Sequence, residues 1–183
     1  VGYYGDVDTV VDETAARGTS FLSDLAAEWE STAATARALG TRVTLLRTGL
    51  VVAAKGGAWG RLTPLAKAGL GGPIGSGKQL WSPISLTDHV AATLFLLEHE
   101  IDGPVNLTGP QPLPQREIAQ TMGRVLHRPA FIPTPLFAVR AVVGGFADEL
   151  GSSQGVVPRR LLDAGFTFRY PTFEAMYRAA VDR

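Results

Sequence analysis

A glycine-rich stretch with one lysine is the first candidate for chemistry. Residues 71–80 read GGPIGSGKQL, in which Gly72 is followed by four residues and then by Gly77 and Lys78. This nearly matches the loop G-x-x-x-x-G-K-[ST], which holds nucleotide phosphates with its backbone N–H groups and its lysine. That loop needs a strand before it, a helix after it and a hydroxyl after the lysine. Here a helix is predicted before it, an extended segment follows, and Gln79 replaces the hydroxyl. The stretch therefore favours a turn over an NTPase loop, and an NTPase is left as a remote third hypothesis.

Other motifs that commonly carry chemistry are incomplete. Gly75 and Gly77 begin the dinucleotide pattern G-x-G-x-x-G, but Leu80 stands where the third glycine belongs. The three histidines, at positions 89, 99 and 127, are not spaced as metal ligands, and the chain has no cysteine. We therefore expect no metal site and no serine or cysteine nucleophile, and the residue patterns leave the catalytic residues unknown.

The composition describes a globular chain without a general attraction for polyanions. Of its 183 residues, 45% are hydrophobic and 19% are charged, and 17 basic residues balance 17 acidic ones. A neutral chain with scattered charges predicts no nucleic-acid partner and no membrane association. The most apolar window, residues 135–147, is short and contains Arg140. The lack of cysteine fits a cytoplasmic protein.

Any active site must be held by alternating helices and strands, which predict an α/β fold. Apolar residues at spacings of three and four predict a helix over about 20–39, ended by Gly40. The mostly apolar RVTLLR, 42–47, predicts a parallel strand covered on both faces. Residues 1–4 are expected to end a strand, and a polar loop is expected up to Gly18.

The second half of the chain continues this alternation. A helix is predicted over 61–70 with Pro64 in its first turn, and an extended segment over 80–85. Ser85 and Asp88 resemble a capping box at the start of the next helix. Further elements are expected in this order: a strand at VNLT, a helix opened by Pro114, an apolar helix over 136–143, a short helix after Pro158 and a last helix around 173–180.

In this order the motifs resemble the extended short-chain dehydrogenase/reductase superfamily, and within it the bacterial NAD-dependent epimerase-like branch with a characteristic small C-terminal domain. The resemblance covers essentially all 183 residues, and its motifs are VGYYGD, AAEWE, LRTGLVV, GLGGPIGSGKQLWSPISLTDHVA, GPVNLTGPQPLPQREIAQTMGRVLHRPAFIPTP and GVVPRRLLDAGFTFRYPTFEAM. It implies part of a Rossmann-type parallel sheet that binds NAD or NADP, over 1–53 and 86–107. It also implies a small α/β substrate-binding domain over 54–85 and 108–183.

The resemblance further implies that the fingerprint glycines and the first strands lie upstream of VGYYG. The 183 residues are therefore expected to be the C-terminal part of such a protein, from the fifth strand onward. Because the turn that binds the pyrophosphate is absent from them, the isolated chain is not expected to bind a dinucleotide tightly.

The matching positions imply two groups of site residues. The cofactor is expected to contact Tyr3, Thr48, Gly49 and Leu50, and a small-molecule substrate is expected to contact Lys78, Trp81 and Ser85. Sugar-nucleotide epimerases often place an arginine before the segment matched here by WSPISLTD, to hold a pyrophosphate. This chain has Trp81 there and Lys78 as the nearby cation. Asp88 is interpreted as structural, a helix-start residue favoured by the helix dipole.

One departure from the family pattern bears on the reaction. The superfamily uses a tyrosine with a lysine four residues later, which lowers the pKa of the phenol for proton exchange with substrate. In this chain the two positions fall near Leu22 and Ala26, and no tyrosine has a lysine at that spacing. Two hypotheses remain open: an NAD(P)-dependent nucleotide-sugar epimerase or dehydratase-like enzyme, or a non-catalytic NAD(P)-binding regulatory or interaction protein.

Overall fold

A computed structural model describes residues 2–182 as a mixed α/β fold, which confirms the predicted fold class. The α-helices are α1 (Phe21–Ala34), α2 (Gly57–Lys67), α3 (Leu86–Glu98), α4 (Gln115–Leu126), α5 (Leu136–Val143), α6 (Phe146–Gly151), α7 (Arg159–Asp163) and α8 (Phe173–Val181). The strands are β1 (Val7–Val11), β2 (Thr44–Thr48), β3 (Leu50–Val52), β4 (Leu80–Trp81), β5 (Pro83–Ser85), β6 (Gly103–Leu107), β7 (Leu113–Pro114) and β8 (Gln154–Val156). Two 3-10 helices, η1 (Gly2–Tyr4) and η2 (Thr35–Leu39), flank β1 and α1.

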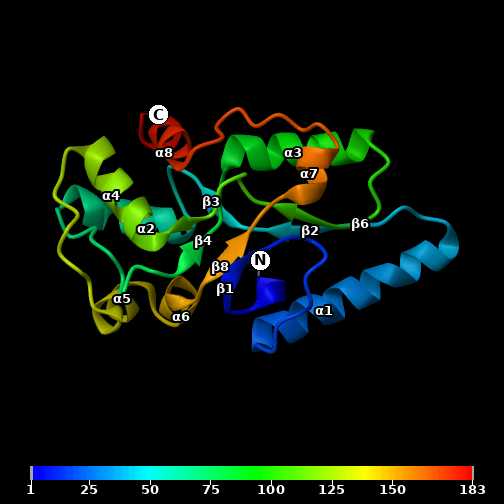
Figure 1. Cartoon of the computed structure of the whole chain (residues 1–183), viewed down its shortest axis with the longest axis horizontal. Coiled ribbons are helices and arrows are strands. Elements are labelled where there is room, and N and C mark those ends of the chain that lie inside the picture. Colours follow the sequence, from blue (N-terminus) through cyan, green and yellow to red (C-terminus); the bar gives the residue numbers. More distant parts are fainter. Residues whose placement is uncertain (1, 183) are drawn as a thin grey trace.

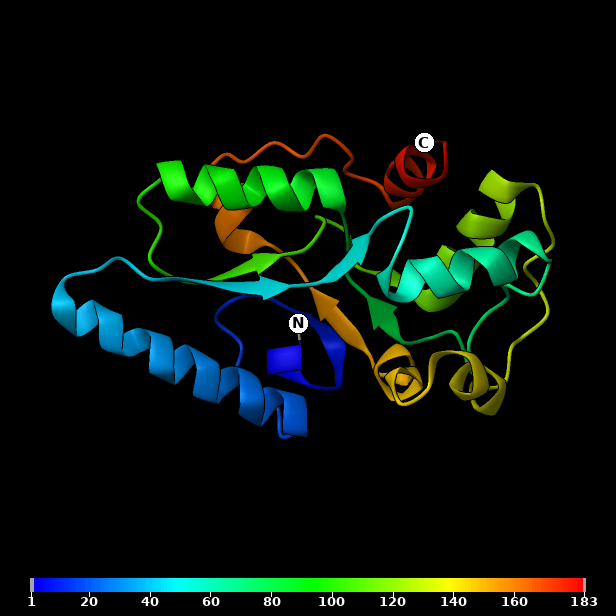
Figure 2. The ribbon, with the colours of Figure 1, turned by 180° about the vertical axis from the view of Figure 1, so that it is seen from behind.

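The centre of the fold is a parallel pair of strands, β2 and β6, in which Arg47 lies opposite Asn106. This pair runs between α3 on one side and α1 on the other in both views of the molecule (Figures 1 and 2). Directly after β2 the chain changes partner: Gly49 N donates to Leu107 O at 3.0 Å, and Leu50 N donates to Ser82 O at 3.0 Å. The next strand, β3, then pairs with β5, also in parallel.

Two further pairs join segments that lie far apart in the sequence. The N-terminal β1 runs parallel to β8, and β4 runs antiparallel to β7. Residues near the start of the chain are therefore held beside residues near its end, as Figure 1 shows for the blue β1 and the orange β8. This pairing brings η1 close to the C-terminal half of the chain.

The apolar core consists of two clusters. One joins α2, β4, α4 and α8 around an aromatic group in which Trp59 contacts Trp81, Phe173 and Tyr177. The other joins β5, α3, β6 and α7, and its members include Ile84, Val105 and Leu107, all at 0% exposure. The first cluster draws mostly on the predicted substrate domain, and the second mostly on the predicted Rossmann part. The domain boundaries themselves stay predictions.

Most predicted elements are present, and four local predictions were wrong. The described part of residues 1–4 is a 3-10 helix and not a strand end, and the expected polar loop contains β1. Pro64 lies inside α2 and not in its first turn, because the helix begins at Gly57. The strand β2 is not covered on both faces, since Leu46 keeps 43% exposure.

The glycine-rich stretch is a turn between α2 and β4, as predicted. Within it Ile74 forms a parallel bridge with Thr134. The backbone N–H of Ile74 donates to Gln115 Oε1 at 2.8 Å. A Cβ at Gly72 would lie 1.8 Å from the Ile132 carbonyl oxygen, so this position has to be glycine for packing reasons. Gly77 has a φ of 64°, which favours glycine as well.

Candidate functional site

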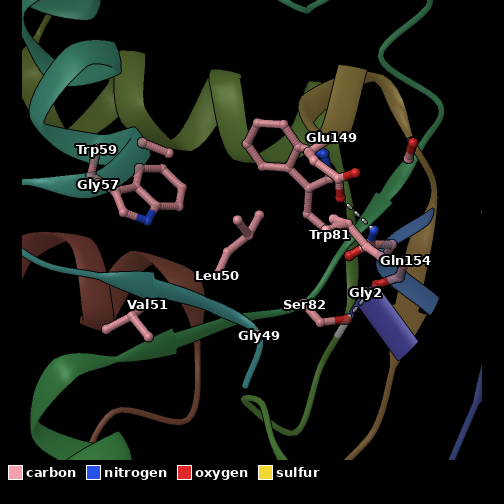
Figure 3. A pocket seen from close by; sticks show the side chains of 13 residues that line it. Gly2, Gly49, Leu50, Val51, Gly57, Trp59, Trp81, Ser82, Glu149 and Gln154 are labelled. Carbon is pink, nitrogen blue, oxygen red and sulfur yellow. Dashed lines mark hydrogen bonds between the residues drawn. The ribbon is translucent and has the colours of Figure 1, made fainter. Parts of the chain in front are cut away.

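A cavity of about 410 Å³ opens where β2 ends and the chain crosses into β3. Its lining is Gly2, Leu22, Gly49, Leu50, Val51, Gly57, Ala58, Trp59, Trp81, Ser82, Glu149, Ser152 and Gln154. Figure 3 shows Trp59 on one wall, Glu149, Trp81 and Gln154 on the opposite wall, and Leu50 between them. The carboxyl ends of parallel strands are where open α/β sheets bind their ligands. We call this space the strand-end cavity.

Gly49 marks the crossing point at the floor of this cavity. A Cβ at this position would lie 2.3 Å from the Ser82 carbonyl oxygen and 2.9 Å from Thr108 Cγ2. The glycine therefore lets β2 and β3 pass close to the neighbouring chain. Its missing side chain also leaves the backbone open to the cavity.

A second cavity of about 560 Å³, here named the α1–β2 groove, lies between α1 and the residues of β2. Its lining includes two of the predicted cofactor residues, Tyr3 and Thr48, and it shares Gly2 and Leu22 with the strand-end cavity. The four predicted cofactor residues are thus divided between two neighbouring cavities. Their role in cofactor binding stays a prediction.

A buried polar network forms the end wall of the α1–β2 groove. Arg47 makes two hydrogen bonds to the Glu30 carboxylate, at 2.7 and 2.8 Å, and a third to the Tyr4 hydroxyl at 2.9 Å. Tyr4 donates in turn to Asn106 Oδ1 at 2.7 Å. The Arg47 guanidinium also lies 3.4 Å over the Tyr3 ring. The network ties α1, β2, η1 and β6 together.

Tyr4 is fixed in this network and is not free to exchange protons. Its side chain is 1% exposed, and its hydroxyl both donates and accepts a hydrogen bond. Burial raises the pKa of Tyr4, although its bond from Arg47 acts in the opposite direction. Tyr177 is similar: burial raises its pKa, and its hydroxyl is bonded to Thr63. Neither phenol has the lowered pKa that a general base needs near neutral pH.

Thr48, at the end of β2, contacts a histidine of α3. Its hydroxyl lies 3.1 Å from His89 Nε2. Partial burial lowers the pKa of His89 and so favours its neutral form. The pair connects the carboxyl end of β2 to α3.

The three predicted substrate residues lie in different environments. Trp81 lines the strand-end cavity, but it is 2% exposed and its indole donates to Leu150 O at 3.2 Å. Ser85 is buried at the N-cap of α3, where it accepts from Asp88 N at 2.8 Å. Lys78 is exposed and lines neither cavity. Only Trp81 is therefore close to the cavity, and a substrate role for any of the three stays a prediction.

The two positions that match the catalytic pair of the superfamily face the cavities with apolar side chains. Leu22 lines both spaces, and Ala26 lines the α1–β2 groove. Helix α1 thus has apolar side chains at the two positions where the superfamily pattern has a tyrosine and a lysine.

Glu149 and Gln154 were not identified from the sequence. Glu149 follows Asp148 in the sequence, is half-buried and lines the strand-end cavity. Gln154 lies on β8, a strand that the sequence analysis missed. The position of Gln154 in the cavity wall depends on contacts of β8 with distant segments, β1 and Ser82, which no local sequence pattern indicates.

A serine motif overlaps this segment. Residues 151–155, GSSQG, fit the nucleophile pattern G-x-S-x-G, which requires a strand-to-helix turn. Here the segment runs from α6 into β8, and Ser153 Oγ accepts a bond from Leu80 N. The strand-to-helix context that the motif requires is therefore not met, and the expectation of no serine nucleophile stays a prediction. Within residues 2–182 no three His, Asp or Glu side chains are grouped to hold a metal ion, and no described helix is long and apolar enough to cross a membrane.

Comparison with known proteins agrees with this geometry. Residues 134–180 match a family model described as a domain of unknown function (DUF1731). An epimerase family protein of Mycobacterium leprae is 46% identical over 175 residues, which are 94% of this chain and 57% of that protein. The crystal structure of human epimerase family protein SDR39U1 with NADPH has a TM-score of 0.89 and 33% identity, covering 100% of this chain and 63% of that chain.

A nucleoside-diphosphate sugar epimerase from Corynebacterium glutamicum is more distant, with a TM-score of 0.75, 26% identity, and coverage of 98% of this chain and 35% of that chain.

The parallel strands with a cavity at their carboxyl ends define a Rossmann-type α/β protein. The chain belongs to the extended short-chain dehydrogenase/reductase superfamily, in its epimerase branch. It spans about half the length of the curated relatives it matches.

Proposed function

We propose that the chain is part of an NAD(P)-dependent epimerase-like protein, in which the reactive end of the cofactor lies in the strand-end cavity. The observation that carries this proposal is the cavity at the end of β2, floored by the backbone of Gly49 and Leu50. The human relative crystallised with NADPH supports it. A bound nicotinamide cofactor supplies hydride transfer. The residues present fit its flat nicotinamide ring, because Leu22, Leu50 and Val51 form an apolar wall.

We assign cofactor binding to one predicted domain and substrate binding to the other. Residues 1–53 and 86–107 serve the dinucleotide, and residues 54–85 and 108–183 serve the substrate. The two apolar clusters support this division, because each holds mainly one of the two sets together. The proposed substrate is a nucleotide sugar, which the more distant epimerase from Corynebacterium supports by its name. We also propose a cytoplasmic location.

A non-catalytic role in which NAD(P) binding regulates a partner is the second candidate. The observation that favours it is the apolar pair Leu22 and Ala26 on α1, together with the engaged hydroxyl of Tyr4. In this case cofactor binding is retained and no substrate is turned over.

Two measurements on the full-length protein test the proposals. Titration with NADPH and with NADH, followed by calorimetry, is expected to show binding in the micromolar range for one or both. Absence of binding at millimolar cofactor would contradict both candidates. Incubation of the cofactor-loaded protein with nucleotide sugars, followed by NMR of the sugar ring protons, then separates them. Turnover excludes the non-catalytic role, whereas binding without any turnover favours it.

A further inference from the structure

The wall of the strand-end cavity opposite Trp59 carries a polar pair. Gln154 Nε2 donates to Glu149 Oε2 at 3.2 Å, at the long end of the hydrogen-bond range. Figure 3 shows both side chains on this wall. A carboxylate has about four lone-pair sites, and an amide has two N–H groups and a carbonyl oxygen. The pair therefore keeps both donors and acceptors for a ligand.

The facing wall offers an apolar surface and one further donor. Trp59 is 1% exposed, and its indole N–H is a buried group without a hydrogen-bond partner among the described residues. In Figure 3 the indole nitrogen faces the space between Leu50 and Val51. Buried donors without a partner are uncommon in native proteins. An indole can only donate, so the group suited to this position is an oxygen acceptor.

The charges of the lining determine what kind of group fits. Among the described residues that line the cavity, Glu149 is the single charged side chain, and none is lysine or arginine. A phosphate here would meet a carboxylate without any compensating cation, which is unfavourable in a partly desolvated space. The cavity therefore suits a neutral group.

From these three observations we propose that the strand-end cavity binds a neutral hydroxylated ring, with Glu149 and Gln154 bonded to its hydroxyl groups. The apolar face of the ring lies toward Trp59 and Leu50, and its charged substituents stay outside the cavity. Such a ring is the glycosyl end of the proposed nucleotide-sugar substrate, so this inference rests on the proposed function. Glu149 and Gln154 then determine specificity for the sugar.

The test compares probes with and without the ring. The NADPH-saturated full-length protein is titrated with UDP-glucose, UDP-galactose and UDP. At least one sugar nucleotide is expected to bind about tenfold more tightly than UDP, the effect of one or two net hydrogen bonds. In Glu149→Leu and Gln154→Leu the preference over UDP is expected to fall to near unity, with UDP affinity unchanged. Glu98→Leu, an exposed position on α3, is the matched control and is expected to keep the preference.

Tryptophan fluorescence reports where the ring binds. Trp59 and Trp81 line the strand-end cavity, whereas Trp29 does not. Sugar nucleotide, and not UDP, is expected to change the tryptophan emission of the full-length protein, and this change is expected to persist in Trp29→Phe. Equal affinities for UDP and both sugar nucleotides in the wild type overturn the inference, and so does a preference that survives both leucine variants. If one of these two results is obtained and NADPH binds, the inference about the sugar ring fails and the proposed function stands. If NADPH itself does not bind, the proposed function fails.

Discussion

Gly49 shows how a single residue controls the geometry of the site. Gly49→Ala is expected to lower the free energy of unfolding by about 1–3 kcal/mol, the usual cost of overpacking, because its Cβ would lie 2.3 Å from the Ser82 carbonyl oxygen. Urea denaturation measures the change. Gly60→Ala is the control, since its nearest neighbour is 3.7 Å away. Inside α2 that alanine is expected to stabilise by about 0.5–1 kcal/mol, and equal effects at both positions would contradict the packing described for Gly49.

His89 gives the second prediction at this scale. Partial burial lowers its pKa in the folded state below the ordinary 6.5. The unfolded chain therefore binds this proton at a higher pH than the folded chain does. The stability contributed by neutral His89 is present above pH 6.5 and is lost as the pH falls through the lower folded value. Urea unfolding over a pH series should show a steeper loss for the wild type than for His89→Gln, and identical profiles would refute the shift.

Helix α3 provides a test at the scale of a secondary-structure element. Ser85 caps it by accepting from Asp88 N, and Asp88 accepts in turn from the backbone N–H groups of Arg169 and Tyr170. Ser85→Ala is expected to lower the free energy of unfolding by about 1–2 kcal/mol, the cost of losing an N-cap. The same titrations with UDP-glucose decide its predicted substrate role. A loss of affinity without a loss of stability would show that Ser85 binds substrate, contrary to its buried position.

The elements that the sequence predicted correctly are those whose signals are local. The helix ended by Gly40, the cap at Ser85 and the strand VNLT each depend on a few neighbouring residues. All three are present, although the last turns before Gly40 are the 3-10 helix η2 and not a continuation of α1. The strands β1 and β8 were missed, because each is stabilised by the other across most of the chain. The cavity wall that contains Glu149 and Gln154 depends on that pairing. Spacing alone could place Gly49 and Leu50 after a strand, but it could not show which distant residues face them.

At the scale of the whole molecule, the Glu30–Arg47 pair joins α1 to the central strands. The two side chains keep 20% and 6% exposure, so removal of one partner leaves a largely buried charge. Glu30→Gln is expected to lower the free energy of unfolding by about 3 kcal/mol, the lower end of the cost of breaking a buried pair. The exposed pair of Arg178 and Glu174 is the comparison. Glu174→Gln is expected to cost less than about 1 kcal/mol, and similar losses in the two variants would exclude a special role for the buried network.

The most direct test of the central claim is NADPH titration of the full-length protein with the strand-end cavity obstructed. Leu22 lines both cavities, whereas its neighbour Phe21 is 78% exposed. Leu22→Trp fills the space between the cavities with a larger side chain, and Phe21→Trp makes a comparable change on the outer face of α1. Calorimetry should show micromolar NADPH binding to the wild type and to Phe21→Trp, and at least about a tenfold loss of affinity, or about 1.4 kcal/mol, in folded Leu22→Trp. Undiminished NADPH binding to Leu22→Trp would contradict the placement of the cofactor in this cavity.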